Sequence, residues 1–174
     1  MVRRLTATLL AACLSTPFAL AAETCVRPAE KAAFDVTALK SRLMVTALVC
    51  NGQERYNAFV TRYRSELLRQ DKVLAGYFNR VFGRRGQQFR DEYTTQLANS
   101  ESQNGLQQGS LFCQNNTPLF DRVMAVPAQG LADFAAGQAI AQPIAVIPCP
   151  AQPAPKKPKS KAKTVTAKNT KTPT

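Results

Sequence analysis

The chain of 174 residues carries 23 Lys and Arg against 11 Asp and Glu, a formal net charge of +12, and it contains no histidine. The absence of histidine excludes the commonest general base, and with it the usual Ser-His and Cys-His catalytic dyads. The charge is unevenly spread, because seven lysines follow Pro150 without an acidic neighbour, whereas residues 22–149 hold 14 basic and 11 acidic residues.

The first residues follow the pattern of a secretory signal peptide. Val2-Arg3-Arg4 is a short positive region, residues 5–14 are apolar, and Ala19-Leu20-Ala21 supplies the small residues that signal peptidase reads. We expect residues 1–21 to be this signal peptide, with cleavage after Ala21 or Ala22, and the mature protein to be periplasmic or secreted. A membrane span is not expected, because Ser15-Thr16-Pro17 interrupts a run shorter than the ~20 apolar residues that a bilayer requires.

A lipoprotein signal is the alternative for this region. Leu10-Ala11-Ala12-Cys13 resembles a lipobox, which would make Cys13 the lipidated first residue of the mature chain. The leader before Cys13 would then be very short, and a second apolar stretch with its own cleavage pattern follows. We therefore favour cleavage after the second stretch.

Four cysteines remain once the leader is removed: Cys25, Cys50, Cys113 and Cys149. An even number in an exported chain predicts disulfides, and four cysteines allow three pairings. We favour Cys50 with Cys113 and Cys25 with Cys149. A metal site or a redox pair is the alternative, but the chain has no C-x-x-C and no histidine, so we expect no metal and no cofactor.

Residues 35–99 have helical periodicity in three segments. The first runs from Asp35, an expected N-cap, to a stop at Asn51-Gly52, after an extended lead-in over residues 25–33. The second spans residues 53–82, either as one long helix or with a kink near residues 69–72, where Gln70 and Asp71 interrupt the apolar pattern. Its apolar positions, three or four residues apart, are Tyr56, Phe59, Val60, Tyr63, Leu67, Leu74, Phe78 and Val81.

A turn at Gly83-Arg84-Arg85-Gly86 leads to the third helix, which carries Phe89, Tyr93 and Leu97 and extends to about Asn99. Residues 99–109 are too polar to bury much surface. Short helices are expected around residues 119–124 and 131–135. The apolar strip at residues 144–147 is expected to lie extended over the helices, with Cys149 as its anchor.

These elements predict an all-α domain over residues 22–149, a small disulfide-linked helical bundle. Residues 150–174 are rich in Pro, Lys, Ala and Thr. They cannot bury enough apolar surface to offset their ordering entropy, so a disordered basic tail is expected.

Two groups of basic residues are candidates for anion binding. Arg84-Arg85 occupies the glycine turn, and arginine bonds phosphate and carboxylate bidentately. The tail adds Lys156, Lys157, Lys159, Lys161 and Lys163. We expect them to meet an anionic envelope polymer or lipid head groups rather than nucleic acid, because the signal peptide directs the chain out of the cytoplasm. The alternatives are a tail that only solubilises and a helix face whose arginines are only solvated.

One short stretch resembles a catalytic signature. Glu101-Ser102, followed by Gly105-Leu106-Gln107-Gln108, resembles the Glu-Ser and Gly-Leu-Met-Gln pieces of lytic transglycosylases, which cleave the peptidoglycan glycan strand with a single glutamic acid. The resemblance implies Glu101 as that acid. It covers eight residues; the family separates the two pieces by a loop, its Met position is Gln107 here, and its later tyrosines are missing.

The favoured function is therefore non-enzymatic: binding or structural association with anionic cell-envelope components through the basic tail and an arginine-rich helix face. The arginines of that face are Arg55, Arg62, Arg64, Arg69, Arg80, Arg84, Arg85 and Arg90. Two alternatives stay open. One is a periplasmic protein-binding module, a chaperone or an inhibitor of an envelope enzyme, that would expose the aromatic stripe of Tyr56, Phe59, Tyr63, Tyr77 and Phe78. The other is a glycan-cleaving enzyme that uses Glu101.

Overall fold

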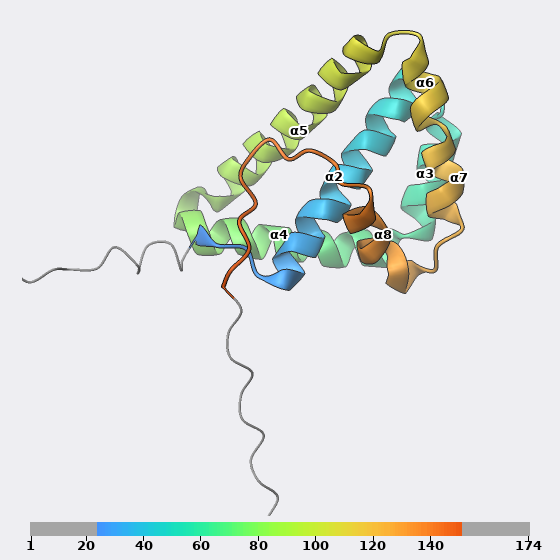
Figure 1. Ribbon diagram of the computed structural model, residues 1–174. Helices are drawn as coiled ribbons and strands as arrows, with labels where there is room; N and C mark the ends of the chain where they lie inside the picture. Colours follow the sequence, from blue (N-terminus) through green and yellow to red (C-terminus); the bar gives the residue numbers. More distant parts are fainter. Residues whose placement is uncertain (1–23, 151–174) are drawn as a thin grey trace, which may run out of the picture.

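The computed structural model describes residues 24–150, which form an all-α fold (Figure 1). Its helices are α2 (Pro28–Val49), α3 (Gln53–Arg62), α4 (Arg64–Phe82), α5 (Gly86–Gln108), α6 (Leu111–Asn116), α7 (Pro118–Met124) and α8 (Leu131–Gly137), with single 3-10 turns η1 (Gly83–Arg85) and η2 (Ala128–Gly130). The predicted disulfide-linked helical bundle is confirmed. The expected signal peptide, Cys13 and the tail lysines lie outside the described residues.

Helix α2 lies at the centre of the fold, with α3, α4, α5, α6 and α8 in contact with it (Figure 1). A helix with neighbours on several sides carries apolar residues around much of its circumference rather than along one stripe. Phe34, Leu39 and Leu43 are accordingly fully buried, as are Ala33 and Ala38. The core therefore forms around α2.

Helix α2 begins at Pro28, where the sequence predicted the start of a short helical turn, and continues without a break to Val49. The expected N-cap at Asp35 and the extended lead-in to residue 33 are therefore wrong. Proline suits the first helical position because its missing N–H would have no partner there. The Glu30 carboxylate then accepts a hydrogen bond of 2.8 Å from the N–H of Arg27, the residue before the helix. Asp35, within the helix, forms an ion pair of 2.6 Å with Lys31.

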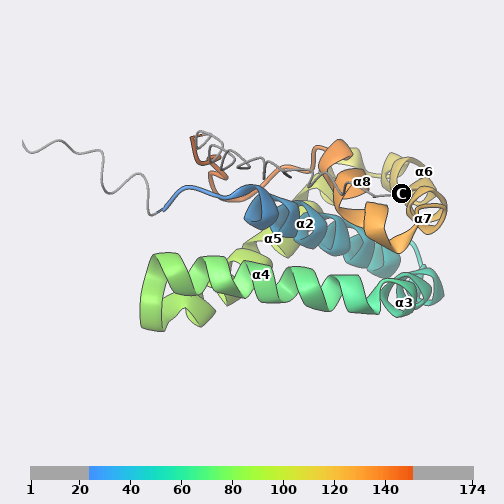
Figure 2. The same cartoon turned by 90° about the horizontal axis from the view of Figure 1, so that it is seen from below.

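The long amphipathic segment is interrupted at Tyr63, not near residues 69–72. Gln70 is buried inside an intact helix because its side-chain amide donates to the Glu66 carboxylate at 2.7 Å. Tyr63 is fully buried, and its hydroxyl proton is shared between the carbonyl oxygens of Val123 and Val126. The chain changes direction at Tyr63, so α3 lies across the end of α4. In Figure 2, α3 is seen down its axis and α4 is seen from the side.

The predicted turn at Gly83–Gly86 is confirmed, and α4 and α5 diverge from it as the two arms of a V (Figure 1). Gly83 has φ +57°, in the left-handed region that favours glycine. Helix α5 continues past Asn99 to Gln108, farther than its polar sequence indicated. Contacts on the side of α5 that faces the core stabilise its last turns: Glu101 is buried there, and Gly105 lies against the Phe112 ring.

The substitution Gly86→Ala tests how closely α5 approaches α4 at this turn. A Cβ there would lie 2.8 Å from the backbone N and Cα of Asn79, so one helix must shift. Such overpacking is expected to lower the free energy of unfolding by about 2 kcal/mol in urea denaturation. The control is Gly76→Ala within α4, where a Cβ meets nothing within 4 Å. We expect the control to stabilise the protein by about 0.5–1 kcal/mol, and equal effects at both positions would contradict the close approach.

Both disulfides have the favoured pairing. Cys25 is bonded to Cys149 with Cα atoms 4.8 Å apart, and Cys50 to Cys113 with Cα atoms 5.6 Å apart. The second bridge joins the end of α2 to α6. The first joins the two ends of the described chain.

Residues 139–150, here called the C-terminal strap, follow α8 in an extended path over the helices, as the sequence predicted (Figure 1). Ile144 and Val146 pack against the core. The Tyr93 hydroxyl donates to Gln142 of the strap at 2.7 Å. Burial, together with the nearby Asp35 carboxylate, holds the pKa of Tyr93 well above its usual value, so this hydroxyl stays a donor.

Candidate anion-binding surface

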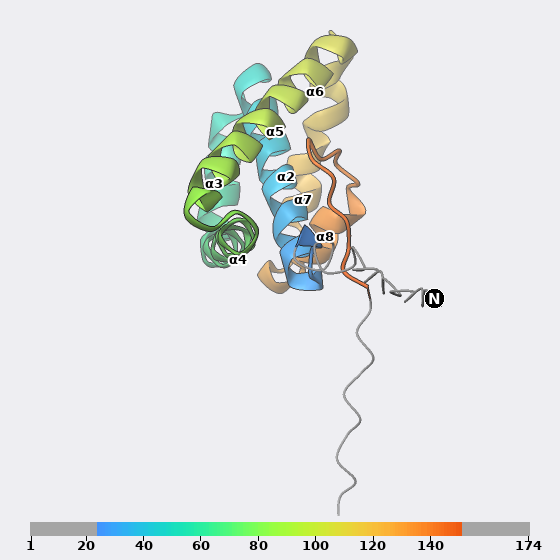
Figure 3. The ribbon, with the colours of Figure 1, turned by 90° about the vertical axis from the view of Figure 1, so that its left-hand side faces the viewer.

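The turn between α4 and α5 places both predicted turn arginines at one extremity of the molecule (Figure 3). Arg84 and Arg85 are exposed. The Arg85 guanidinium lies 4.7 Å from the centroid of the Phe89 ring, a cation–π arrangement that orients it without neutralising its charge. Sequence positions 72–90 contain no acidic residue. The field around this turn is therefore positive.

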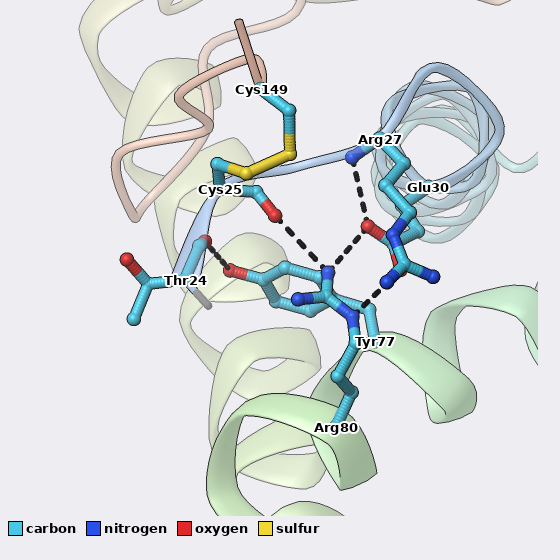
Figure 4. Close-up of polar contacts among 7 residues, drawn as sticks. All are labelled: Thr24, Cys25, Arg27, Glu30, Tyr77, Arg80 and Cys149. Atoms are coloured by element: carbon cyan, nitrogen blue, oxygen red, sulfur yellow. Dashed lines mark hydrogen bonds and ion pairs between the residues drawn. A yellow bond between two sulfur atoms is a disulfide. The ribbon is translucent and has the colours of Figure 1, made fainter. Parts of the chain in front are cut away.

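An ion pair between Arg80, in the last turn of α4, and Glu30 of α2 holds the N-terminal segment against the end of α4 (Figure 4). Arg80 bonds both oxygens of the Glu30 carboxylate, at 2.6 and 3.2 Å, and donates to the carbonyl oxygen of Cys25 at 3.1 Å. The Tyr77 hydroxyl donates to the carbonyl oxygen of Thr24 at 3.2 Å. Arg80, one helical turn before Arg84, therefore joins α4 to α2 and to the N-terminal segment.

The Cys25–Cys149 bridge holds the end of the C-terminal strap against this N-terminal segment. Val26 donates its N–H to the Ile147 carbonyl at 2.8 Å, and Cys149 donates its N–H to the Val26 carbonyl at 2.9 Å. Val26 and Pro148 thereby form an isolated parallel bridge. The described chain therefore ends, at Pro150, toward the same end of α4 as the α4–α5 turn. Figures 2 and 3 show the turn and the end of the strap on opposite sides of this end, with the start of α2 between them.

We call this region the tail-bearing end, defined by residues 24–27, 80–86 and 148–150. It combines the exposed pair Arg84 and Arg85 with the point from which the lysine-rich segment continues. The lysines themselves, Lys156, Lys157, Lys159, Lys161 and Lys163, lie outside the described residues, so their contact with an anion stays a prediction.

The other arginines of residues 53–90 do not form one cationic face. Arg69 pairs with Glu66, Arg55 lies 3.5 Å from Asp121, and Arg90 lies 3.6 and 3.7 Å from Asp71 and Asp91. Arg62 donates to the Val126 carbonyl and lies over the Tyr63 ring. Carboxylates thus offset several of these charges. Arg64 is also exposed but lies at the other end of α4, so among the arginines of residues 53–90 the anion-binding candidates are Arg84 and Arg85.

Glu101, the acid implied by the resemblance to lytic transglycosylases, forms a buried ion pair. Its side chain is 3 % exposed, and both of its oxygens accept hydrogen bonds from Arg42, at 2.8 and 3.1 Å. A shallow hollow lies along the outer side of α5, but Glu101 is not among its lining residues, which are Gln87, Gln88, Asp91, Glu92, Thr95 and Gln96. The buried pair joins α2 to α5, which is a structural role.

The aromatic stripe proposed as a partner surface lies in the core. Phe59 and Tyr63 are fully buried, Tyr77 and Phe78 are nearly so, and only Tyr56 is half-exposed. Phe34 makes edge contacts with Tyr77 and Tyr93, with centroids 5.0 and 5.2 Å apart. The stripe therefore offers no aromatic patch for a partner protein.

The sequence reasoning missed the aromatic residues that flank the arginine turn. Phe82 stacks on Phe89 with ring centroids 4.1 Å apart, and on Phe78 at 5.9 Å. The sequence could have indicated them, because Phe82 and Phe89 lie on the two sides of the Gly-Arg-Arg-Gly turn. A tight turn between two helices brings such flanking side chains close to each other and to the arginines of the turn.

Within residues 24–150, no group of three or more His, Cys, Asp or Glu side chains is arranged to hold a metal ion. In the same range, none of the helices has both the length and the apolar character needed to span a bilayer. No protein-family model, curated protein or solved structure matches this chain.

Proposed function

We propose that this is an exported, non-enzymatic binding or structural protein that associates with anionic components of the cell envelope. The signal peptide at residues 1–21 would be removed on export, and the folded domain would bind through its tail-bearing end. One observation carries the proposal: Arg84, Arg85 and the origin of the lysine-rich segment lie at the same end of the molecule.

Two disulfides support a location outside the cytoplasm, because disulfides form and persist in oxidising compartments. The anions available there are phosphates and carboxylates of lipid head groups, lipopolysaccharide and acidic polymers. All of these share the chemistry that guanidinium and ammonium groups recognise. The proposed ligand is therefore defined by its anionic groups, on a lipid or on a polymer.

The expected strength of the association follows from charge. A lysine near an anionic membrane contributes ~1 kcal/mol at modest salt, and composition predicts that the residues after Pro150 are a disordered tether. Seven lysines on such a tether would hold a small domain at a surface. Arg84 and Arg85 would then fix which end of the domain faces it.

Co-sedimentation with anionic vesicles, and separately with lipopolysaccharide, tests the proposal. We expect the mature protein to bind at low salt, and to be released at about 1 M salt, where the Debye length is about 3 Å. A form that ends at Pro150 should bind at least about tenfold more weakly, because it lacks all seven tail lysines. Binding to one of the two particles alone would identify the source of the anion.

A matched pair of arginine variants tests the orientation. Arg84→Gln with Arg85→Gln should weaken binding severalfold. Arg64→Gln with Arg122→Gln removes the same charge from exposed positions at the far end of α4 and on α7, and should change binding little. Equal binding by the full and shortened forms would remove the tail from the proposal. Equal loss in the two arginine pairs would mean that the domain has no preferred orientation.

A further inference from the structure

Phe82 is a large apolar side chain that is partly exposed at the α4–α5 turn. Its exposed fraction is 37 %, whereas the other phenylalanines of residues 24–150 are half-buried or buried. The ring is held in place, because it stacks on Phe89 with centroids 4.1 Å apart and on Phe78 of the core with centroids 5.9 Å apart. The turn thus presents a rigid aromatic group.

The apolar ring and the cations are adjacent. Gly83 separates Phe82 from Arg84, and Arg85 lies over Phe89, the ring that also stacks on Phe82. No carboxylate occurs between Asp71 and Asp91 in the sequence. An aromatic ring beside unopposed guanidinium groups matches the boundary of an anionic bilayer, where phosphates lie above acyl chains.

The shape of the domain allows this group to reach a surface. Helices α4 and α5 diverge away from the turn, so η1 and the residues beside it project at one extremity (Figures 1 and 3). The segment after Pro150 continues from the same end. A surface that faces this end of the molecule meets both the turn, with Phe82, Arg84 and Arg85, and the point from which the lysine-rich segment continues.

We propose that the α4–α5 turn is a membrane-interface contact, in which the Phe82 ring enters the head-group boundary of an anionic phospholipid bilayer while Arg84 and Arg85 bond lipid phosphates. This rests on the proposed function and specifies its ligand as a lipid surface. A soluble polyanion would engage the same cations but would leave the ring in water.

The chain contains no tryptophan, so a single introduced indole reports its own surroundings. In Phe82→Trp the indole replaces a ring of similar shape in the stack. The control is Leu106→Trp, at an 82 % exposed position near the other end of α5. With vesicles of phosphatidylglycerol and phosphatidylcholine that carry brominated acyl chains, we expect blue-shifted, quenched emission from Trp at position 82 and unchanged emission at position 106. Inorganic polyphosphate should quench neither.

A second variant measures affinity without a probe. Phe82→Ala should weaken vesicle binding about fivefold, from the loss of the apolar contact, and leave polyphosphate binding unchanged. Its matched control, Leu106→Ala, should change neither. If the Phe82→Trp protein sediments with vesicles but is not quenched, and Phe82→Ala binds as well as the native protein, the turn does not enter the bilayer and the tail alone holds the domain. If the native protein does not sediment with vesicles, the lipid contact is excluded, and binding to lipopolysaccharide or polyphosphate decides whether the wider proposal survives.

Discussion

Replacement of Cys25 and Cys149 by alanine is expected to lower the free energy of unfolding by about 4 kcal/mol, because the bridge closes a long loop in the unfolded chain. The two residues are 124 positions apart in the sequence. In the folded protein the bridge also anchors the C-terminal strap beside Val26, so its loss should free the strap before it unfolds the helices. Urea denaturation followed by circular dichroism measures the first effect, and hydrogen exchange at residues 140–149 measures the second.

The control for strap release is the Cys50→Ala, Cys113→Ala variant. Its bridge spans 63 positions, so a loss of about 4 kcal/mol is expected here too, but exchange in the strap should remain slow. If both variants release the strap equally, the Cys25–Cys149 bridge is not its specific anchor. A loss below about 1 kcal/mol for Cys25 and Cys149 would show that the local hydrogen bonds hold this end without the bridge.

Glu101→Gln is expected to destabilise the protein by about 3 kcal/mol, since it leaves the Arg42 guanidinium with no carboxylate partner. Arg42 is 19 % exposed and Glu101 is 3 % exposed, so water replaces the lost bonds poorly. The control is Glu92→Gln, on the exposed side of the same helix, which should cost less than about 0.5 kcal/mol. Urea denaturation compares the two.

The double variant Arg42→Met, Glu101→Leu replaces the whole ion pair. It separates the contribution of the pair to the free energy of unfolding from the destabilisation caused by removing only one partner. Apolar residues of similar volume often replace a buried ion pair without loss, so the double variant should be more stable than Glu101→Gln alone. The same residue decides the enzymatic alternative. If the native protein cleaved purified peptidoglycan and Glu101→Gln abolished cleavage while the fold stayed intact, the structural role assigned to this carboxylate would be wrong.

Local sequence signals predicted the elements that depend on local chemistry. Asn51-Gly52 ends α2, with Asn51 at φ 56° and the Gly52 N–H donating to the Ala47 carbonyl at 2.8 Å. The Gly83–Gly86 turn also forms where the glycines indicated. The disulfide pairing was predictable as well, because one pair joined the ends of the domain and the other joined the first helix to the segment after the hairpin.

The errors have both local and long-range causes. The start of α2 at Pro28 follows local signals, proline at the first helical position and the Glu30 bond to Arg27, and Arg80 on α4 adds a long-range bond to Glu30. The interruption at Tyr63 is accompanied by its hydrogen bonds to Val123 and Val126 on a later segment. Periodicity counts apolar residues, so it placed the break at Gln70, a polar residue that the core accepts through a bond to Glu66.

The candidate surface was predicted in part. Arg84 and Arg85 could be chosen from the sequence because a glycine turn exposes its side chains. That the lysine-rich segment continues from the same end could not, since it depends on the contact of Arg80 with Cys25 and on the bridge to Cys149. The other arginines were expected to form one cationic face. Glu66 lies three residues before Arg69 on the same helix, so the sequence spacing already indicated that pair, whereas only the fold brings Asp121 near Arg55.

Peptide mapping by mass spectrometry, under non-reducing conditions and on protein isolated from its own cells, tests the central claim of an exported, doubly bridged domain most directly. We expect the chain to begin at Ala22 or Glu23, with one linked pair of peptides containing Cys25 and Cys149 and a second containing Cys50 and Cys113. Four free thiols in a chain that still carries residues 1–21 would contradict export, and a cytoplasmic polyanion would then replace the envelope as the partner of the basic tail.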